Sequence, residues 1–235
     1  MPTESKSVPE RIVDLMYKMA GSHPGSRPVH AKGLVCQGTF RASGEAPRMS
    51  RAAHLRGQPV PATIRFANSS GDPNVHDGQP NVRSMAVKLQ VAGGKPADIV
   101  ANSIEGSVAA ITGCRRPARA LLTPEVGCQR GPNFLREELA ERLARGPAGF
   151  RLTLQVAADG DPTDDPTALW PADRPTAELG RLEIGSISPT SAADEQRLIF
   201  DPANVADGIE LSADPILLAR SPAYGVSYAR RNPKA

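Results

Sequence analysis

Residues 33–40, Gly33-Leu-Val-Cys-Gln-Gly-Thr-Phe40, are the first of three short runs that decide the fold. The other two, Ala62–Phe66 and Ser84–Val91, share this strand-like composition, and the turn-forming clusters Ser69–Pro73 and Ala92–Gly94 lie between and after them. Runs of this length that end at Gly, Pro, Asp and Ser clusters are typical of strands joined by tight turns. This region therefore predicts an antiparallel sheet.

Helical patterns lie on both sides of this region. A capping box and apolar residues at helical spacing predict a helix over Pro9–Ala20, and the same spacing predicts another over Asn133–Arg145. Ser212 is the predicted N-cap of a final helix, which Pro222 would kink. Further strands are predicted over 148–156 and 182–187, with an ordered loop between them. The expected architecture is an α+β fold that forms a single domain over residues 1–235.

Composition excludes several function classes. The chain has 28 basic and 25 acidic residues and a net charge of +3, without a long basic run, so no nucleic-acid partner is expected. No stretch reaches the ~20 apolar residues that span a bilayer, and the polar start lacks a signal-peptide pattern. We therefore expect no membrane partner and a cytoplasmic location. Three cysteines, Cys36, Cys114 and Cys128, lie far apart and predict free thiols.

One histidine and one helix carry the candidate chemistry. His30 lies at the entry to the first strand, with Arg27 three residues before it. Such a lone histidine is most often a surface or core residue. In the final helix, Arg220 and Tyr224 share one face, and an adjacent guanidinium would lower the pKa of the phenol. From spacing alone, an amphipathic helix with a half-buried tyrosine and solvated arginines is the favoured alternative.

Five segments, taken in order, resemble the haem catalases. The resemblance is carried by Arg27-Pro-Val-His-Ala-Lys-Gly33, by Pro61–Phe66 with Ser70-Gly-Asp72, by Asn81–Lys88, by Asp98–Ser103, and by a C-terminal group consisting of Phe200–Asn204, Gly208–Glu210 and Arg220–Tyr224. The middle of the chain is more similar to the small catalase-related peroxidases, with an apparent internal deletion after Val108. The resemblance implies a catalase-like antiparallel β-barrel with flanking helices, which the deletion would leave incomplete.

The resemblance also implies a haem b cofactor and a set of site residues. Tyr224 would be the axial ligand of the iron, and Arg220 would keep its phenolate deprotonated. His30 and Asn102 would be catalytic, with His30 moving a proton between the two peroxide oxygens and Asn102 orienting the peroxide. Arg27 and Arg65 would pair with the haem propionates, and Arg231 would reach a propionate or add positive potential. Val29 would narrow the approach channel.

Two departures from the family pattern concern the distal side. Ala67 stands where catalases commonly have a serine that supports the distal histidine, although Asn68 or Ser69 could substitute. After Asn102 the chain continues with Ser103 instead of the family's proline and phenylalanine, so the cover over the haem is expected to be thin.

The implied function is a haem-dependent peroxidase that reduces hydrogen peroxide or small organic hydroperoxides. Its partners would be the peroxide and a small organic reductant, and assembly into a homo-oligomer stays open. Two alternatives remain: a haem-binding or relict module without turnover, and an enzyme of the same fold that rearranges lipid hydroperoxides.

Overall fold

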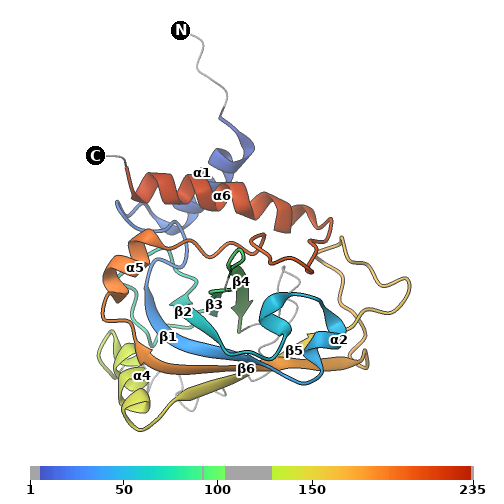
Figure 1. Cartoon of the computed structure of the whole chain (residues 1–235). Coiled ribbons are helices and arrows are strands. Elements are labelled where there is room, and N and C mark those ends of the chain that lie inside the picture. Colours follow the sequence, from blue (N-terminus) through green and yellow to red (C-terminus); the bar gives the residue numbers. More distant parts are fainter. Residues whose placement is uncertain (1–5, 92, 104–128, 234–235) are drawn as a thin grey trace.

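The computed structural model describes residues 6–91, 93–103 and 129–233 (Figure 1). The strands of this part of the chain are β1 (Gly33–Ala42), β2 (Val60–Asn68), β3 (Arg83–Leu89), β4 (Ala97–Asn102), β5 (Ala148–Gln155) and β6 (Thr176–Ile187). Its helices are α1 (Val8–Ala20), α2 (Ala46–Met49), the 3₁₀ helix η1 (Ala53–Leu55), α4 (Phe134–Ala144), α5 (Ser191–Arg197) and α6 (Pro215–Arg231).

The described strands form one sheet in the order β4-β3-β2-β1-β6-β5, and every neighbouring pair is antiparallel. The predicted antiparallel sheet and its helical flanks are confirmed. The sheet leaves β4 and β5 at its two edges, so within the described residues it is an incomplete barrel. The apparent deletion after Val108 lies outside the described residues.

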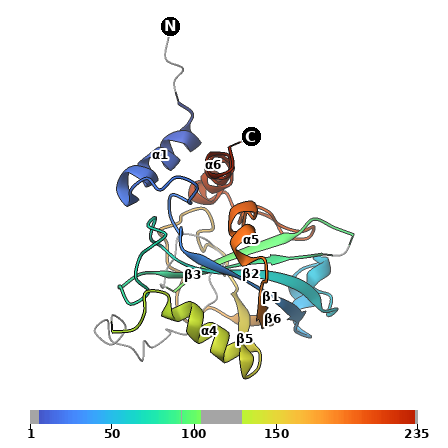
Figure 2. The ribbon, with the colours of Figure 1, turned by 90° about the vertical axis from the view of Figure 1, so that its left-hand side faces the viewer.

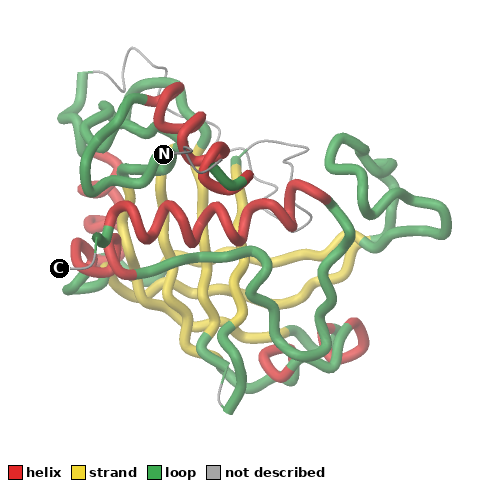
Figure 3. The backbone as a smooth tube through the Cα atoms, turned by 90° about the horizontal axis from the view of Figure 1, so that it is seen from above, coloured by secondary structure: helices red, strands yellow, loops and turns green. Residues whose placement is uncertain are grey.

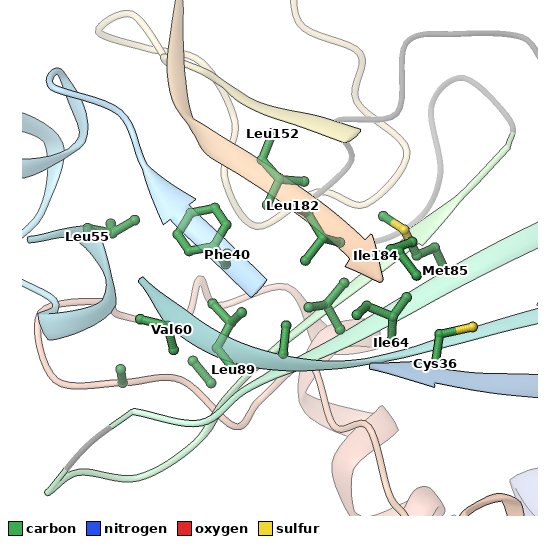
Figure 4. Packing of buried hydrophobic residues seen from close by; sticks show 14 of the residues in the cluster. Cys36, Phe40, Leu55, Val60, Ile64, Met85, Leu89, Leu152, Leu182 and Ile184 are labelled. Atoms are coloured by element: carbon green, nitrogen blue, oxygen red, sulfur yellow. The ribbon is translucent and has the colours of Figure 1, made fainter. Parts of the chain in front are cut away.

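One face of the sheet curls around a single apolar core. Side chains from all six strands belong to one cluster, including Ile64, Leu152 and Leu182, and Figure 4 shows them packed between the strands. Ile64 and Leu182 are 0% exposed. Because side chains alternate along a strand, the residues between these core positions point to the opposite face.

That opposite face carries polar residues and is covered by helices. Arg65 on β2 and Asp98 on β4 are buried on this face, although they are charged. Helix α5 packs against β1, and α1 packs against α6. Figures 1 and 3 show α6 lying across the strands on this side, and Figure 2 shows α4 at the other side, near β5.

The final helix begins later than the sequence predicts. Asp214, not Ser212, is its N-cap, and its carboxylate accepts a hydrogen bond from the backbone N–H of Ile216 at 2.7 Å. Pro215 occupies the first turn, where a missing N–H costs nothing. The helix then continues through Pro222 to Arg231.

Among the described residues, no helix is both long and apolar enough to cross a membrane.

Candidate functional site

His30 lies in the loop before β1 with a left-handed backbone, φ 57°. This region is sparsely populated by residues other than glycine and persists where surrounding contacts hold it. Those contacts come from β2 and the turn after it. Arg65 Nη2 donates to the His30 carbonyl at 2.6 Å, and the backbone N–H of Ala31 donates to the Ser70 carbonyl at 2.9 Å. These contacts therefore fix the backbone position from which the His30 side chain projects.

The hydrogen bonds of the ring define its tautomer. His30 Nδ1 lies 2.8 Å from the backbone carbonyl oxygen of Asn68 and 3.1 Å from Ser84 Oγ. A carbonyl can only accept, so Nδ1 carries the hydrogen and Nε2 keeps its lone pair. Ser84 Oγ donates its own hydrogen to the Ala67 carbonyl at 3.3 Å, which leaves the oxygen free to accept from Nδ1.

The ring is neutral at physiological pH. Desolvation lowers the pKa of His30 to about 4, and the positive charge of Arg65 adds to that effect, with smaller contributions from Arg220 and Arg27. A neutral imidazole with a free Nε2 can accept a proton. Since Arg220 belongs to α6, its influence also shows that this helix lies within electrostatic range of His30.

Ser84 is a contact of His30 that the sequence does not reveal. Ala67 on β2 and Ser84 on β3 are directly opposite each other in the sheet, so the hydroxyl missing from one strand is supplied by its neighbour. Asn68 also contributes, through its backbone carbonyl and not its side chain, whereas Ser69 bonds to Asn81. The His30 tautomer is therefore held although Ala67 has no hydroxyl. A cross-strand register, which a single sequence does not contain, was needed to find Ser84.

Asn102 lies on the same side of the sheet as this network. It is the last residue of β4 and is directly opposite Ser84 in the β3–β4 ladder. Directly opposed residues in an antiparallel pair point to the same face. The structure thus brings the two predicted catalytic residues, His30 and Asn102, to one region through Ser84. Val29 precedes His30 and is partly buried.

Tyr224 on α6 is engaged by an arginine one turn before it. Arg220 Nε and Nη2 donate to Tyr224 Oη at 3.1 and 2.6 Å, and the guanidinium lies 5.5 Å from the ring centroid. Two donors from one cation hold the Tyr224 oxygen in a charge-assisted contact. The structure confirms the shared face of these two residues, and both side chains are partly buried.

The three arginines predicted to contact propionates lie in one cluster. Arg27 and Arg65 both bind the Glu195 carboxylate, and Arg27 and Arg231 both donate to the backbone carbonyl of Leu198. Glu195 belongs to α5, a helix that the sequence does not predict. Nothing in its local sequence indicates a partner 130 residues away on β2.

These residues fit a haem. The phenolic oxygen of Tyr224 is a suitable ligand for ferric iron, a neutral histidine suits proton transfer to a bound peroxide, and a cluster rich in guanidinium groups suits two propionates. No group of three or more His, Cys, Asp or Glu side chains able to hold a separate metal ion is found among the described residues.

The family model and the relatives that match this chain all belong to the catalases. The catalase family model matches residues 11–106 and 128–233, with a break that includes the region after Val108. A catalase-related peroxidase of Mycolicibacterium paratuberculosis is 30% identical, and the alignment covers 95% of this chain and 94% of the relative. A catalase-related peroxidase of Synechococcus elongatus is 36% identical over 42% of this chain and 29% of its own length.

Solved structures agree on the fold. A bacterial catalase superposes with a TM-score of 0.74 and 16% identity, and catalase A of Saccharomyces cerevisiae with 0.75 and 17%. The two superpositions cover 98% and 94% of this chain, respectively. They cover 62% and 64% of the solved catalases, so this chain spans less than two thirds of the length of each. The family model, the relative of matching length and the shared fold together place this chain in the catalase family of peroxide-acting oxidoreductases, as one of its small members.

Proposed function

We propose that this protein is a haem-dependent peroxidase that reduces hydrogen peroxide or small organic hydroperoxides with an organic electron donor. The observation that carries the proposal is the pair of hydrogen bonds from Arg220 to Tyr224 Oη, at 2.6 and 3.1 Å. A tyrosine held in this way has the acceptor oxygen that an axial ligand needs. The catalase-related peroxidase names of the relatives support the same reading.

The proposed cofactor is haem b, held by residues from three parts of the chain. Tyr224 would ligate the iron, and Arg220 would keep its phenolate charged. Arg27, Arg65 and Arg231 would bind the propionates as part of the cluster described above, and Val29 would narrow the approach to His30. When bound, haem supplies the electrons that cleave the O–O bond, and the organic donor later replaces them.

The protein's own contribution to the reaction is a proton transfer. His30 Nε2 has a free lone pair, so it can take the proton of one peroxide oxygen and return it to the other. The second oxygen then leaves as water, or as an alcohol from an organic hydroperoxide, while the O–O bond breaks. Asn102 would hold the peroxide by hydrogen bonding during this transfer. Positioned proton transfer of this kind contributes on the order of 10²–10⁴ in rate.

An absorption spectrum tests the axial ligand directly. Protein loaded with haem is expected to give a high-spin ferric spectrum, which Tyr224→Phe should lose because it has no ligating oxygen. Tyr228→Phe is the matched control, since it removes a hydroxyl one turn further along the same helix and should keep the spectrum. No haem band in the wild type, or an unchanged spectrum in Tyr224→Phe, would contradict the proposal.

Turnover separates the remaining alternatives. His30→Gln should retain haem but lose peroxide-dependent oxidation of a dye by on the order of 10²–10⁴. Haem uptake by the wild type without turnover would indicate a module without activity. Consumption of a lipid hydroperoxide without oxidation of the dye would indicate a rearranging enzyme.

A further inference from the structure

One carboxylate, that of Glu195, pairs with the buried Arg65 and the partly buried Arg27 next to the His30 loop. Glu195 Oε2 accepts from Arg65 Nη2 at 2.7 Å and from Arg27 Nη1 at 3.1 Å, and Arg65 Nε reaches both carboxylate oxygens at 2.8 and 3.0 Å. The side chains of Arg65 and Glu195 are 6% and 14% exposed. Close bidentate pairing in a place with little water is the geometry in which a carboxylate holds a guanidinium firmly.

Arg231, the third arginine, shares a backbone carbonyl acceptor with Arg27. The carbonyl oxygen of Leu198 accepts from Arg27 Nη2 at 3.0 Å and from Arg231 Nη2 at 2.9 Å, while Arg231 Nε donates to the Gln196 carbonyl at 3.2 Å. These acceptors carry no net charge. They orient Arg231 and Arg27 without neutralising either, so the negative charge of the cluster comes from Glu195.

The cluster is therefore short of negative charge. Three guanidinium groups, those of Arg27, Arg65 and Arg231, face one carboxylate, and no second carboxylate of the described residues makes an ion pair with any of them. The neighbouring Asp194 is engaged by Arg197 instead. Two positive charges remain uncompensated at residues where burial and mutual repulsion lower the pKa of Arg27 to about 9 and also lower that of Arg231.

Donor groups remain for a ligand. Glu195 occupies the Nε and Nη2 side of Arg65, and the described residues provide no hydrogen bond to Arg65 Nη1. The same is true of Arg231 Nη1, since the bonds of that side chain involve Nε and Nη2. These two nitrogens are donors for an anion that leave the contacts of Glu195 in place.

We propose that Glu195 is the internal counter-ion of this cluster and sets its net charge at two positive charges, which matches a ligand bearing two carboxylates. This inference rests on the proposed function, in which that ligand is haem with its two propionates. Glu195 is accordingly a specificity-determining residue for the charge of the cofactor. It does not take part in the reaction with peroxide.

The test compares haem with its dimethyl ester, in which both propionates are uncharged. Dissociation constants for both are measured on apoprotein by absorption titration, and the quantity of interest is the ratio of the ester's constant to that of haem. Glu195→Gln keeps an oxygen acceptor but leaves three positive charges, so the ratio should rise on the order of tenfold. Glu183→Gln, an exposed glutamate on β6, is the control and should leave the ratio as in the wild type.

Two further variants test the charge count itself. Arg27→Gln leaves one excess positive charge and should lower the ratio. The double variant returns the cluster to two excess charges and should restore a ratio close to that of the wild type. The comparison of Arg27→Gln with the double variant keeps the test decisive if Glu195→Gln alone does not fold.

The outcomes separate this inference from the proposed function. A wild type that binds neither haem nor the ester would overturn the proposed function, and this inference with it. A wild type that binds haem, with a ratio unaffected by Glu195→Gln, would overturn the role of Glu195 alone. Equal weakening of both ligands in Glu195→Gln would mean that the carboxylate only supports the local fold.

Discussion

Replacing His30 by glutamine should remove a large part of the acid sensitivity of the folded apoprotein. The pKa of His30 is about 4 in the folded protein against an ordinary value of 6.5. The unfolded chain therefore binds the proton more tightly, and stability is lost as the pH falls from about 6.5 towards 4. Since one pKa unit corresponds to about 1.4 kcal/mol, the full loss is about 3 kcal/mol, of which about 2 kcal/mol is reached by pH 5.

The assay is urea denaturation of the apoprotein at pH 7 and pH 5, with the free energy of unfolding extrapolated to water. The wild type should lose about 2 kcal/mol more than His30→Gln between these two pH values. Taking the difference between the two proteins removes the contributions of other titrating groups. His23→Gln is the control for removing a histidine elsewhere in the chain.

An equal loss of stability in the wild type and in His30→Gln would refute the reasoning. It would mean that His30 is solvated in the folded protein, and that the contacts of Nδ1 with Asn68 and Ser84 do not hold a neutral ring. A direct measurement of the tautomer by nitrogen NMR provides a second check, since Nδ1 should be protonated and Nε2 unprotonated at pH 7.

Three further predictions concern the frame around the site. Gly33→Ala should destabilise the protein by about 1–3 kcal/mol in thermal unfolding, because the new Cβ would lie 2.5 Å from Arg65 Nη2; an unchanged melting temperature would count against this packing. Asp98→Ala should cost about 3 kcal/mol by leaving the partly buried Lys88 without its carboxylate, 2.6 Å away in the wild type, whereas replacing both residues by apolar ones should cost much less. Leu182→Ala, at a position that is 0% exposed, should cost about 2–5 kcal/mol in urea denaturation, and a loss below 1 kcal/mol would contradict its place in the core.

Local patterns predicted the elements whose signals are local. The capping box before the first helix is present, with the Glu10 carboxylate accepting from the Ser7 N–H at 2.8 Å, and the helix ends at Ala20 as expected. The element over Ala97–Asn102 has no alternating pattern and was missed as a strand, and α5 is too short to show helical periodicity. Its place is decided by contacts with β1, not by its own propensity.

By itself, the sequence determined the type of fold and singled out most of the candidate site residues. The strand runs, the helix signals and the order of the motifs that resemble catalases all act through neighbouring residues, so one chain read in order contains them. His30 was singled out by its motif. Arg220 and Tyr224 were paired by their spacing, because a contact between residues i and i+4 depends only on the helix.

Only the tertiary structure decided which distant residues complete the site. Ser84 reaches His30 across 54 residues through the register of β2 and β3, and Glu195 reaches Arg65 across 130 residues through the packing of α5 on β1. Neither contact leaves a local pattern, since register and helix packing follow from the burial of the whole core. The protonation state of His30 and the charge of the arginine cluster are therefore properties of the folded chain.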